Sequence, residues 1–476
     1  MHEDTFFHAA FLRRIGCLFT QKCSRRNSFY ATFSKTKITN FRIDLLTINS
    51  TILVNMMKKN LSILLLLTLF TGIQISSAQQ HPDLKYRTFR VTLFPGLSTN
   101  GVEAPNYSAK YSLNILGGYH GALDGYEIGI VNINKYYAEG LQLGVVNGTG
   151  GHMMGLGLAS LVNFAGEDMQ GLHFAGIGNI SGEFMQGLQF AGIMNMGGGG
   201  MQGLQFAGIG NLAGDDIQGL QFAGIFNAGS GDSQGIKMSG IGNFNGGFSQ
   251  GIHMGGILNV AYELQGISMA GILNVANEMV GVQLAGIANI ADEAQGVQVG
   301  LVNIADEFEG VPVGLISLYG NGRKNLDFWV SDGGYTNVGL KLGTMDIYNM
   351  ISLGYNSALN SEELWSFGWA IGAHTPLEEA WNNDRFDGYF RMKDISIQSI
   401  QEEDDDVWET NLYSFRYLLG KEISNGFGIY AGPTLNLLVQ DEEDQRDYSW
   451  YSIFDGNRWD KNFDFWVGFT AGVQLF

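Results

Sequence analysis

Hydrophobic and polar residues alternate with period two through most of the chain, in short segments separated by glycine. In the segment 203–211, Leu204 and Phe206 fall on one side and Gln205 on the other, which is the pattern of a half-buried β-strand. A second short apolar stretch follows, and small or acidic residues such as 213–216 then predict a turn. Since no segment has the length and spacing of an amphipathic helix, the pattern predicts an all-β protein.

The strand-like segments form a tandem repeat of about sixteen residues, and the stretches 187–195, 203–211 and 219–227 differ at a single position. A glycine opens each of thirteen repeats, at positions 125, 140, 155, 171, 187, 203, 219, 235, 251, 266, 281, 296 and 310. An asparagine follows each glycine by seven or eight positions, except that Ser317 replaces it in the last repeat. These asparagines are Asn132, Asn147, Asn163, Asn179, Asn195, Asn211, Asn227, Asn243, Asn259, Asn274, Asn289 and Asn303.

Two architectures satisfy this repeat. In a parallel β-solenoid each repeat is one rung of a stack, whereas in an antiparallel meander within one large barrel each repeat is a strand and a turn. Stacked rungs bring all the asparagines into one hydrogen-bonded ladder, while a meander sends alternate asparagines to opposite ends. The constant asparagine therefore favours the solenoid. The repeat glycines would permit a positive φ or a close approach between rungs.

After Ser317 the repeats stop, and longer alternating runs rich in aromatic residues begin. Eight can be marked, around 326–331, 336–344, 347–356, 364–374, 388–399, 409–421, 427–439 and 463–475. The last run has one apolar and one polar or small face, which is typical of a membrane barrel with an outward apolar band, although soluble β-sandwiches and barrels alternate in the same way. We expect an antiparallel, eight-stranded β-barrel. Aromatic residues near strand ends would suit interfacial girdles: Trp365, Trp369, Tyr430 and Trp466.

The N-terminal region has the features of an export signal. A basic start, an apolar run over 61–70 and small residues before position 79 predict a secretory signal peptide over 57–78, cleaved between Ala78 and Gln79. Residues 1–56 show no periodic pattern and are interpreted as a mis-assigned upstream extension. The working chain then comprises N-terminal strands, the glycine-rich repeat array and the C-terminal β-barrel, over 79–120, 121–320 and 321–476.

Charge and cysteine content narrow the classes of partner. Without residues 1–78 the chain would hold 17 Lys and Arg against 43 Asp and Glu, a formal charge of about -26. Nucleic acid is excluded as a partner, since binding it needs a basic surface. Both cysteines, Cys17 and Cys23, fall in the removed region, so we expect no disulfide partner and no thiolate metal ligand.

The sequence contains few candidate catalytic residues. The residues two positions after each repeat glycine are expected to form an outward, solvated polar stripe: Glu127, Gln142, Gly157, His173, Gln189, Gln205, Gln221, Lys237, His253, Ser268, Gln283, Gln298 and Pro312. In a solenoid, Lys237 and His253 would be neighbours, and solenoid enzymes use such charged interruptions in sugar chemistry. No carboxylate in the stripe lies beside them, so we expect no catalytic residue here.

Two other patterns have ordinary structural explanations. Met169, Met185, Met201 and the apolar residues at equivalent positions are expected to fill the core rather than bind a metal. The acidic runs 402–406 and 441–444 could hold Ca²⁺, but their place between strands favours solvated loops. No phosphate-binding loop, His-Glu-x-x-His or Gly-x-Ser-x-Gly motif is present in the sequence, so we expect neither cofactor nor metal.

The repeats 281–289 and 296–303, with the entry segment 94–101, resemble the glycine-rich surface-repeat proteins of Gram-negative envelopes. The stretch 426–433 and Phe476 are similar to outer-membrane β-barrel proteins, although Phe476 is out of phase with Leu475 on the apolar face. The first resemblance covers residues 90–317 and the second covers the remainder. Together they imply a cell-surface location and no established chemistry.

We therefore expect a non-enzymatic protein of the outer membrane and cell surface, with a structural or binding and adhesive role. Its partners would be outer-membrane lipid and a surface ligand or polysaccharide. One alternative is an outer-membrane pore or transport protein, in which the repeats and the C-terminal strands share one large barrel. A second alternative is a carbohydrate-active solenoid enzyme.

Overall fold

The computed structural model describes residues 84–356, 364–402, 410–424, 426–441, 451–458 and 461–475. The predicted upstream extension and signal peptide, with Ala78 and Gln79, lie outside these residues, as does Phe476. The prediction of an all-β protein is confirmed. The described part contains a single short α-helix and two 3-10 helices: α4 (Leu377–Trp381), η1 (Gly101–Asn106) and η2 (Asp384–Phe386).

The first 21 strands belong to one sheet system, which forms the repeat array. They are β1 (Lys85–Phe94), β2 (Leu97–Ser98), β3 (Tyr107–Thr149), β4 (Met153–Ala165), β5 (Met169–Ala175), β6 (Gly178–Ser181), β7 (Met185–Ala191), β8 (Met194–Gly197), β9 (Met201–Ala207), β10 (Gly210–Ala213), β11 (Ile217–Ala223), β12 (Phe226–Gly229), β13 (Ser233–Ser239), β14 (Gly242–Gly255), β15 (Leu258–Ala270), β16 (Leu273–Ala285), β17 (Ala288–Ile290), β18 (Glu293–Val299), β19 (Val302–Ala305), β20 (Glu307–Val313) and β21 (Ile316–Tyr319).

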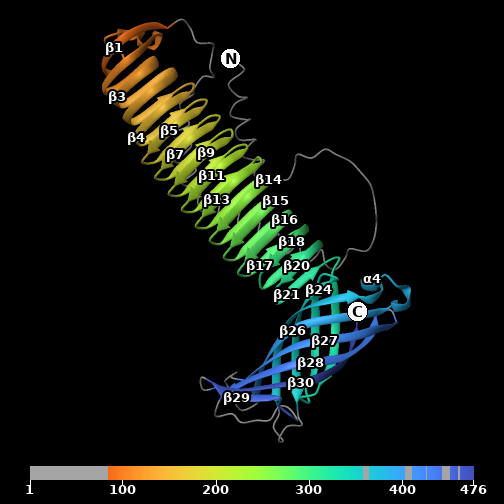
Figure 1. Cartoon of the computed structure of the whole chain (residues 1–476). Coiled ribbons are helices and arrows are strands. Elements are labelled where there is room, and N and C mark those ends of the chain that lie inside the picture. The colour runs from red at the N-terminus through yellow and green to blue at the C-terminus, as the bar shows by residue number, and fades with distance from the viewer. Residues whose placement is uncertain are drawn as a thin grey trace. The chain divides into compact units, whose positions relative to one another are not determined.

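Each repeat supplies one long and one short strand segment, as in β9 and β10. The long strand β11 pairs in parallel with β9, with Gly219 opposite Gly203, and the short strand β12 pairs in parallel with β10. Successive repeats thus stack in register as the rungs of a parallel β-solenoid of about 11 turns (Figure 1). The predicted solenoid is confirmed, and the alternative meander is wrong. The reason is that every strand segment of the repeat runs in the same direction as its neighbours.

Two compact units can be distinguished along the chain. The first contains the residues up to Leu188 together with Gly197–Gly199, and the second contains Gln189–Met196 and the chain from Gly200 onward. In the first unit, β1 pairs in parallel with the start of β3, with Lys85 opposite Tyr107. Parallel stacking therefore begins before Gly125, the first repeat glycine.

The repeat glycines have the conformation that the sequence predicts. From Gly140 onward they adopt positive φ, between +109° and +139°. A Cβ atom added to Gly219 would lie 2.0 Å from the carbonyl oxygen of Gly203 on the adjacent rung, and the other repeat glycines are equally close to their neighbours. Both the backbone conformation and the space between rungs therefore require glycine.

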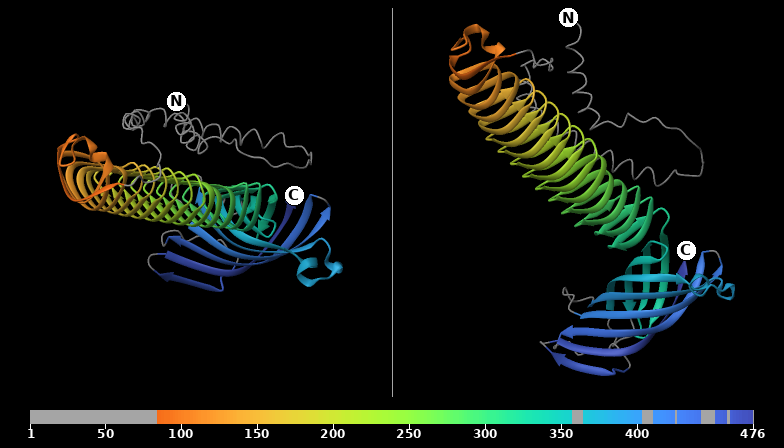
Figure 2. Two further views of the ribbon diagram at one scale, coloured as in Figure 1. Left: turned by 90° about the horizontal axis from the view of Figure 1, so that it is seen from above. Right: turned by 45° about the horizontal axis from the view of Figure 1, so that its top comes forward.

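The remaining strands form a second, antiparallel sheet. They are β22 (Arg323–Ser331), β23 (Thr336–Gly343), β24 (Ile347–Asn356), β25 (Leu364–Pro376), β26 (Tyr389–Glu402), β27 (Thr410–Ser424), β28 (Phe427–Asp441), β29 (Phe454–Arg458) and β30 (Lys461–Leu475). Pairing of β22 with β30 closes eight of these strands into a barrel, as the sequence predicts, and β29 is a short addition paired with β30. Figure 2 shows the two kinds of sheet, with stacked rungs in the array and long crossing strands in the barrel.

The array core contains the residues two positions before each repeat glycine. In the second unit Leu264, Met279 and Phe308 pack with small alanines of the short strands, and Met201 packs with Ile217. The expected core-filling role of this position is confirmed. Within the described part of the chain, no helix combines the length and the apolar character needed to cross a bilayer.

Candidate functional site

Four charged side chains meet inside the barrel because they alternate with outward apolar residues on their strands. Lys341 Nζ lies 2.5 Å from Asp327 Oδ2, and Arg416 donates from Nε and Nη2 to the carboxylate of Asp394 at 2.6 and 3.0 Å. All four side chains are buried. A buried charge is tolerated when it is paired and hydrogen-bonded, so these are matched structural ion pairs.

Aromatic side chains surround the two ion pairs. The Tyr348 hydroxyl donates to Asp394 at 2.7 Å, and Lys341 Nζ lies 4.9 Å from the Tyr348 ring centroid. The Arg416 guanidinium lies 5.0 Å from the ring centroid of Trp329. Cation–π contacts of this kind stabilise desolvated cations. The barrel interior is therefore filled by an interlocked polar and aromatic cluster.

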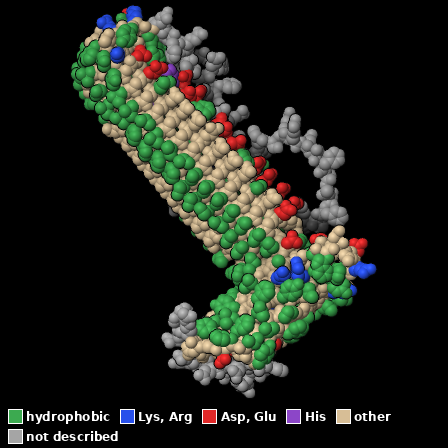
Figure 3. Space-filling model, in the orientation of Figure 1, with side chains coloured by type: hydrophobic (Ala, Val, Ile, Leu, Met, Phe, Trp, Pro, Cys, Tyr) green, Lys and Arg blue, Asp and Glu red, His purple; other side chains and the backbone are tan. Residues whose placement is uncertain are grey.

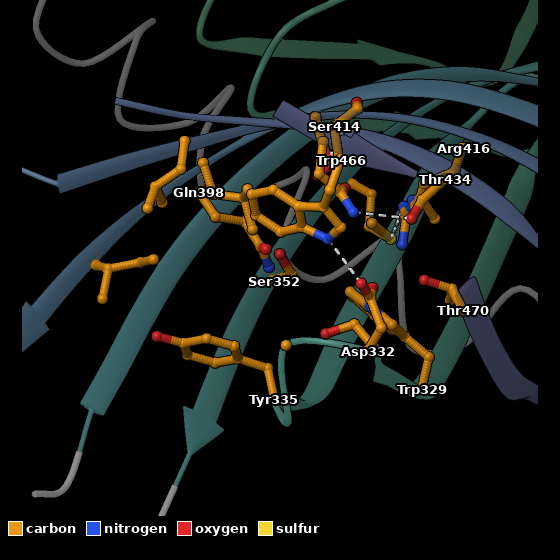
Figure 4. Close-up of a pocket in the computed structure, with 18 residues that line it drawn as sticks. Trp329, Asp332, Tyr335, Ser352, Gln398, Ser414, Arg416, Thr434, Trp466 and Thr470 are labelled. Atoms are coloured by element: carbon orange, nitrogen blue, oxygen red, sulfur yellow. Dashed lines mark hydrogen bonds between the residues drawn. The ribbon is translucent and has the colours of Figure 1, made fainter. Parts of the chain in front are cut away.

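One pocket opens beside this cluster, between β22, β24, β26, β27, β28 and β30 (Figure 4). Its cavity volume is about 30 Å³, which is room for about two water molecules. The indole of Trp466 points at Asp332 and donates to its Oδ2 atom at 2.6 Å. Hydroxyl and amide groups share the remaining wall with apolar side chains: they belong to Ser352, Ser414, Thr434, Thr470, Gln398 and Asn436.

The pocket can hold water or a small neutral polar group. Asp332 is engaged by Trp466 and Arg416 by Asp394, so neither charge is available to a charged substrate without breaking an existing hydrogen bond. No group of three or more His, Cys, Asp or Glu side chains placed to hold a metal ion occurs among the described residues.

The barrel exterior is mainly apolar. Leu353, Ile395 and Phe469 are each more than half exposed, while their strand neighbours point inward. The other exposed apolar side chains of these strands include Leu326, Phe328, Val330, Leu340, Trp365, Phe367, Tyr413, Phe415, Leu419, Ile429, Leu435, Leu437, Val467 and Leu475. The barrel thus has the reverse of the usual soluble arrangement, with charge inside and hydrocarbon outside.

The expected aromatic girdle is only partly correct. Trp365 is exposed on the barrel exterior, but Tyr430 and Trp466 are buried inside the barrel. The reason is strand parity, because Tyr430 shares a face with Thr434 and Trp466 shares a face with Thr470. Trp369 lies on the outer face, and its indole donates to the carbonyl of Gly314 at 2.8 Å.

The repeat asparagines lie inside the array, fully buried or nearly so. In the second unit each Nδ2 donates to the Oδ1 of the asparagine on the next rung, as from Asn211 to Asn227 at 2.8 Å. The same amide also donates to a backbone carbonyl, as from Asn211 to Phe222 at 2.9 Å. The first unit has the same ladder over Asn132, Asn147, Asn163 and Asn179. The ladder satisfies amides that would otherwise be costly to bury.

Two residues at the ends of this ladder are not evident from the repeat pattern. Asn114 donates to Asn132 at 2.9 Å, one rung before the glycine frame begins. At the other end, Asn303 donates to Ser317, and Asn349 on β24 donates to the same hydroxyl at 3.1 Å. A gap of 32 residues separates Asn349 from Ser317, so no repeat spacing could identify it.

The expected outward polar stripe is wrong. Its residues are buried inside the array: Glu127, Gln142, His173, Gln189, Gln205, Gln221, Lys237, His253, Ser268, Gln283 and Gln298 are at most 2 % exposed. Leu204 and Phe206 lie on the outer side instead. Stacking in register explains the reversal, because Gln221 donates to Gln205 at 2.9 Å and Gln298 to Gln283 at 2.8 Å. The exposed polar row consists of the residues just before most of the repeat glycines, such as Gln202 and Gln218.

The structure does bring Lys237 and His253 together on adjacent rungs, but in the interior. The His253 Nε2 atom lies 2.7 Å from Ser249 Oγ, and Lys237 Nζ donates to Asn245 Oδ1. Burial lowers the pKa of Lys237 to about 7. Burial, with a smaller contribution from Lys237, lowers the pKa of His253 to about 3. The cluster contains a nucleophile and a base, yet it lies within the packed array rather than on a surface.

A buried ion pair near the start of the array has no signal in the repeat. Arg90 Nη2 donates to Glu127 Oε1 at 3.1 Å, and Asn134 and Gln142 donate to Oε2 of the same carboxylate. Burial by itself would raise the pKa of Glu127, but the charge of Arg90 and these hydrogen bonds bring that pKa below its ordinary value. The pair therefore remains charged within the described solenoid interior.

Acidic side chains are aligned in the strands of successive rungs, before each repeat glycine. Glu263, Glu278, Glu293 and Glu307 stand opposite one another in consecutive rungs. Figure 3 shows acidic side chains along one edge of the array and a separate stripe of hydrophobic side chains along it. The acidic runs 402–406 and 441–444 fall largely outside the described residues.

Comparisons with known proteins give no relative from which a role could be transferred. No family model, no curated protein and no solved structure matches this chain.

Proposed function

We propose that the chain is a non-enzymatic outer-membrane protein, in which the barrel is the membrane anchor and the repeat array presents an extended structural or binding surface. The observation that carries the proposal is the inverted barrel. Its exterior exposes apolar side chains on all eight strands, with Lys324, Lys393 and Lys421 as charged exceptions, and its buried interior holds Asp327, Lys341, Asp394 and Arg416. A bilayer is the solvent in which this arrangement is stable.

The filled interior supports an anchor rather than a pore. Eight strands enclose a space just wide enough to be filled by side chains. Here the ion pairs and their aromatic neighbours occupy it, and the pocket beside them has a volume of about 30 Å³. Passage of a solute would require these charged pairs to separate.

The interior of the array supports a non-enzymatic role. Its asparagines and most of its other polar residues take part in ladders and buried pairs, and Ser249 and His253 are buried with them. The outer side carries Gln, Leu, Ile, Phe and Met in regular rows. Regular rows of this kind suit contact with an extended partner, such as a polysaccharide or another protein.

The membrane anchor can be tested by placing one arginine on the barrel exterior. In a bilayer, Leu353→Arg would put a charge against lipid at a cost of about 2–4 kcal/mol, whereas an exposed leucine of a soluble protein accepts arginine with little effect. We expect the full-length variant to lose heat-modifiable migration in gels and to leave the membrane fraction.

The matched control is Val102→Arg, at a residue of η1 that is 86 % exposed and lies outside the barrel. It should behave like the parent protein. The proposal is overturned if Leu353→Arg folds as well as the control, or if the parent protein stays monodisperse in water without detergent. Protease treatment of intact cells would then report whether the array is on the cell surface, since only an exposed array should be degraded.

A further inference from the structure

The short strands of the array carry an outer face without any polar or charged side chain. It consists of three rows in the second unit, which flank the buried asparagine and alanine positions. The rows are Ile193, Ile209, Ile225, Ile241, Ile257, Ile272, Ile287, Leu301 and Leu315; then Met194, Gly210, Phe226, Gly242, Leu258, Leu273, Ala288, Val302 and Ile316; then Met196, Leu212, Ala228, Phe244, Val260, Val275, Ile290, Ile304 and Leu318. We call this surface the short-strand face.

The short-strand face is exposed along its length. Ile225, Ile257 and Ile287 are 39 %, 39 % and 49 % exposed, and the residues of the other two rows are mostly half-buried. The outer side of the long strands differs, because a row that includes Gln202, Gln218 and Gln234 runs along it. A contiguous apolar surface of this size marks an interaction site.

Charge indicates which partner fits. Between Lys135 and Arg323 the only Lys or Arg is Lys237, and that residue is buried. The short-strand face therefore has no exposed cation beside it for lipid headgroups, whereas amphipathic surface binders are rich in Lys and Arg. The chain is strongly acidic, with a formal charge of -19 over its full sequence. Two copies repel one another at most surfaces, but not where both present an uncharged face.

The dimensions of the face suit a second copy. Nine rungs spaced about 4.8 Å apart and four strand positions about 3.3 Å apart give a face of about 570 Å². Two such faces bury about 1,100 Å² in total, above the roughly 1,000 Å² that a biological interface should reach. Because the rungs repeat at constant spacing, the face is complementary to itself over its whole length.

The acidic turns determine the direction of packing. They follow the short strands at one edge of the face, as with Asp215 and Asp216 after β10. A two-fold axis running along the array puts the acidic turns of the two copies at opposite edges. A two-fold axis across the array would put them side by side, where they repel. We propose that the short-strand face joins two copies of this chain in parallel about a two-fold axis along the array.

Cysteine cross-linking tests this arrangement. In a full-length background with Cys17→Ser and Cys23→Ser, Phe226→Cys and Ala288→Cys each place one thiol in the central row of the face, four rungs apart. A bis-maleimide with a reach of about 10 Å matches the separation of packed sheets. We expect each variant alone, in membranes, to give a covalent dimer with at least ten times the yield of the control Leu284→Cys, on the outer side of the long strands.

Each other outcome contradicts the proposal. An antiparallel pair would link Phe226→Cys to Ala288→Cys in mixed samples and neither to itself, since four rungs span about 19 Å. A face covered by lipid would react with a photoactivatable lipid at position 288 and give no dimer. Equal dimer yield at position 284 would indicate random collision.

A charge variant provides an independent measurement. Leu258→Lys places an ammonium group on the face without entering the core, and Met269→Lys does the same on the long-strand side. Analytical ultracentrifugation of the reconstituted protein should show dimers for the parent and for Met269→Lys, and monomers for Leu258→Lys. A monomeric parent, or a Leu258→Lys variant that remains dimeric, overturns the proposal.

Discussion

Lys237 occupies an interior position that glutamine holds on the preceding rungs and His253 on the following rung. It stands opposite Gln221, whose Oε1 atom has no hydrogen-bond partner among the described residues. Its pKa is about 7 in the folded chain against an ordinary value of 10.5. The unfolded chain therefore holds this proton more tightly. The free energy of unfolding should rise as pH increases from 7 to 10.5, and be insensitive to this group below about pH 7.

We expect Lys237→Gln to stabilise the protein and to remove this pH dependence. The new amide can donate to Gln221 and extend the ladder, and the gain at pH 7 should be on the order of 3 kcal/mol. Thermal unfolding of the full chain at pH 7 and pH 10, followed by circular dichroism, measures it. Lys110→Gln, at an exposed residue of β3, is the control and should change little. An equal gain in stability at both pH values would contradict the lowered pKa of Lys237.

Each repeat glycine affects the stability of the whole array, because the adjacent rung leaves no space for a side chain at that position. Gly219 has φ of +136°, and an added Cβ would lie 2.0 Å from the carbonyl oxygen of Gly203. We expect Gly219→Ala to destabilise the array by more than about 3 kcal/mol, through strain and rung separation. Gly117→Ala is the control, since its Cβ would make an ordinary contact of 3.5 Å with Val131. Denaturant titration measures the free energy of unfolding of both variants. Similar losses of stability would contradict the prediction, because they would show that the rungs move apart readily.

At the scale of the element, stacking in register repeats favourable and unfavourable contacts alike. Asparagine and glutamine amides gain a partner on each rung, and the rings of Phe206 and Phe222 stack with centroids 5.0 Å apart. Glu263, Glu278 and Glu293 are aligned by the same register, and like charges directly opposite one another are unfavourable.

Glu278→Gln should therefore stabilise the array by about 0.2–1 kcal/mol at low salt. The gain should shrink at 1 M salt, where exposed charges are screened. Glu103→Gln is the control. It removes an attractive, exposed ion pair with Lys85 and should therefore give no gain in stability. Thermal unfolding at two salt concentrations measures both. A gain that is independent of salt would mean that repulsion is not its cause.

Removal of a whole rung tests the architecture of the element. Deletion of residues 203–218 joins Gln202 to Gly219 and restores the register one rung shorter. Because each rung contacts only its neighbours, we expect this variant to fold with a slightly lower stability. Deletion of residues 347–356, the strand β24, should abolish folding of the barrel, because closure needs every strand. Limited proteolysis compares the two deletion variants. Equal sensitivity of both variants to the protease would contradict the solenoid architecture.

At the scale of the whole molecule, the sequence predicts where the strands lie better than it predicts which side of each strand faces the interior. The spacing of glycine and asparagine identifies the solenoid, and alternation identifies the eight closed barrel strands to within a few residues. Alternation alone cannot say which side of a strand is inside. Gln205 is buried and Phe206 is on the outside, because in-register amides pair across rungs, and this tertiary effect has no local signature.

The parts missed by sequence analysis depend on contacts between distant residues. Tyr430 and Trp466 have the composition of an interfacial girdle, but they point into the barrel beside the ion pairs. Arg90 is 37 residues from Glu127 and lies before the repeats, and Glu127 is the only glutamate in its repeated slot. Polar residues that occur once, and that find their partners only in the folded state, cannot be deduced from a periodic pattern.

The equality of the rungs has a consequence for how such a chain can change over generations. One rung corresponds to about 48 nucleotides, and the nearly identical stretches 187–195, 203–211 and 219–227 favour misaligned recombination in the gene. Gain or loss of one unit would alter the reach of the array by about 4.8 Å, while the register of strand pairing at the new junction remains the same. The length of the array can thus change in evolution by whole rungs, without any new kind of contact between residues.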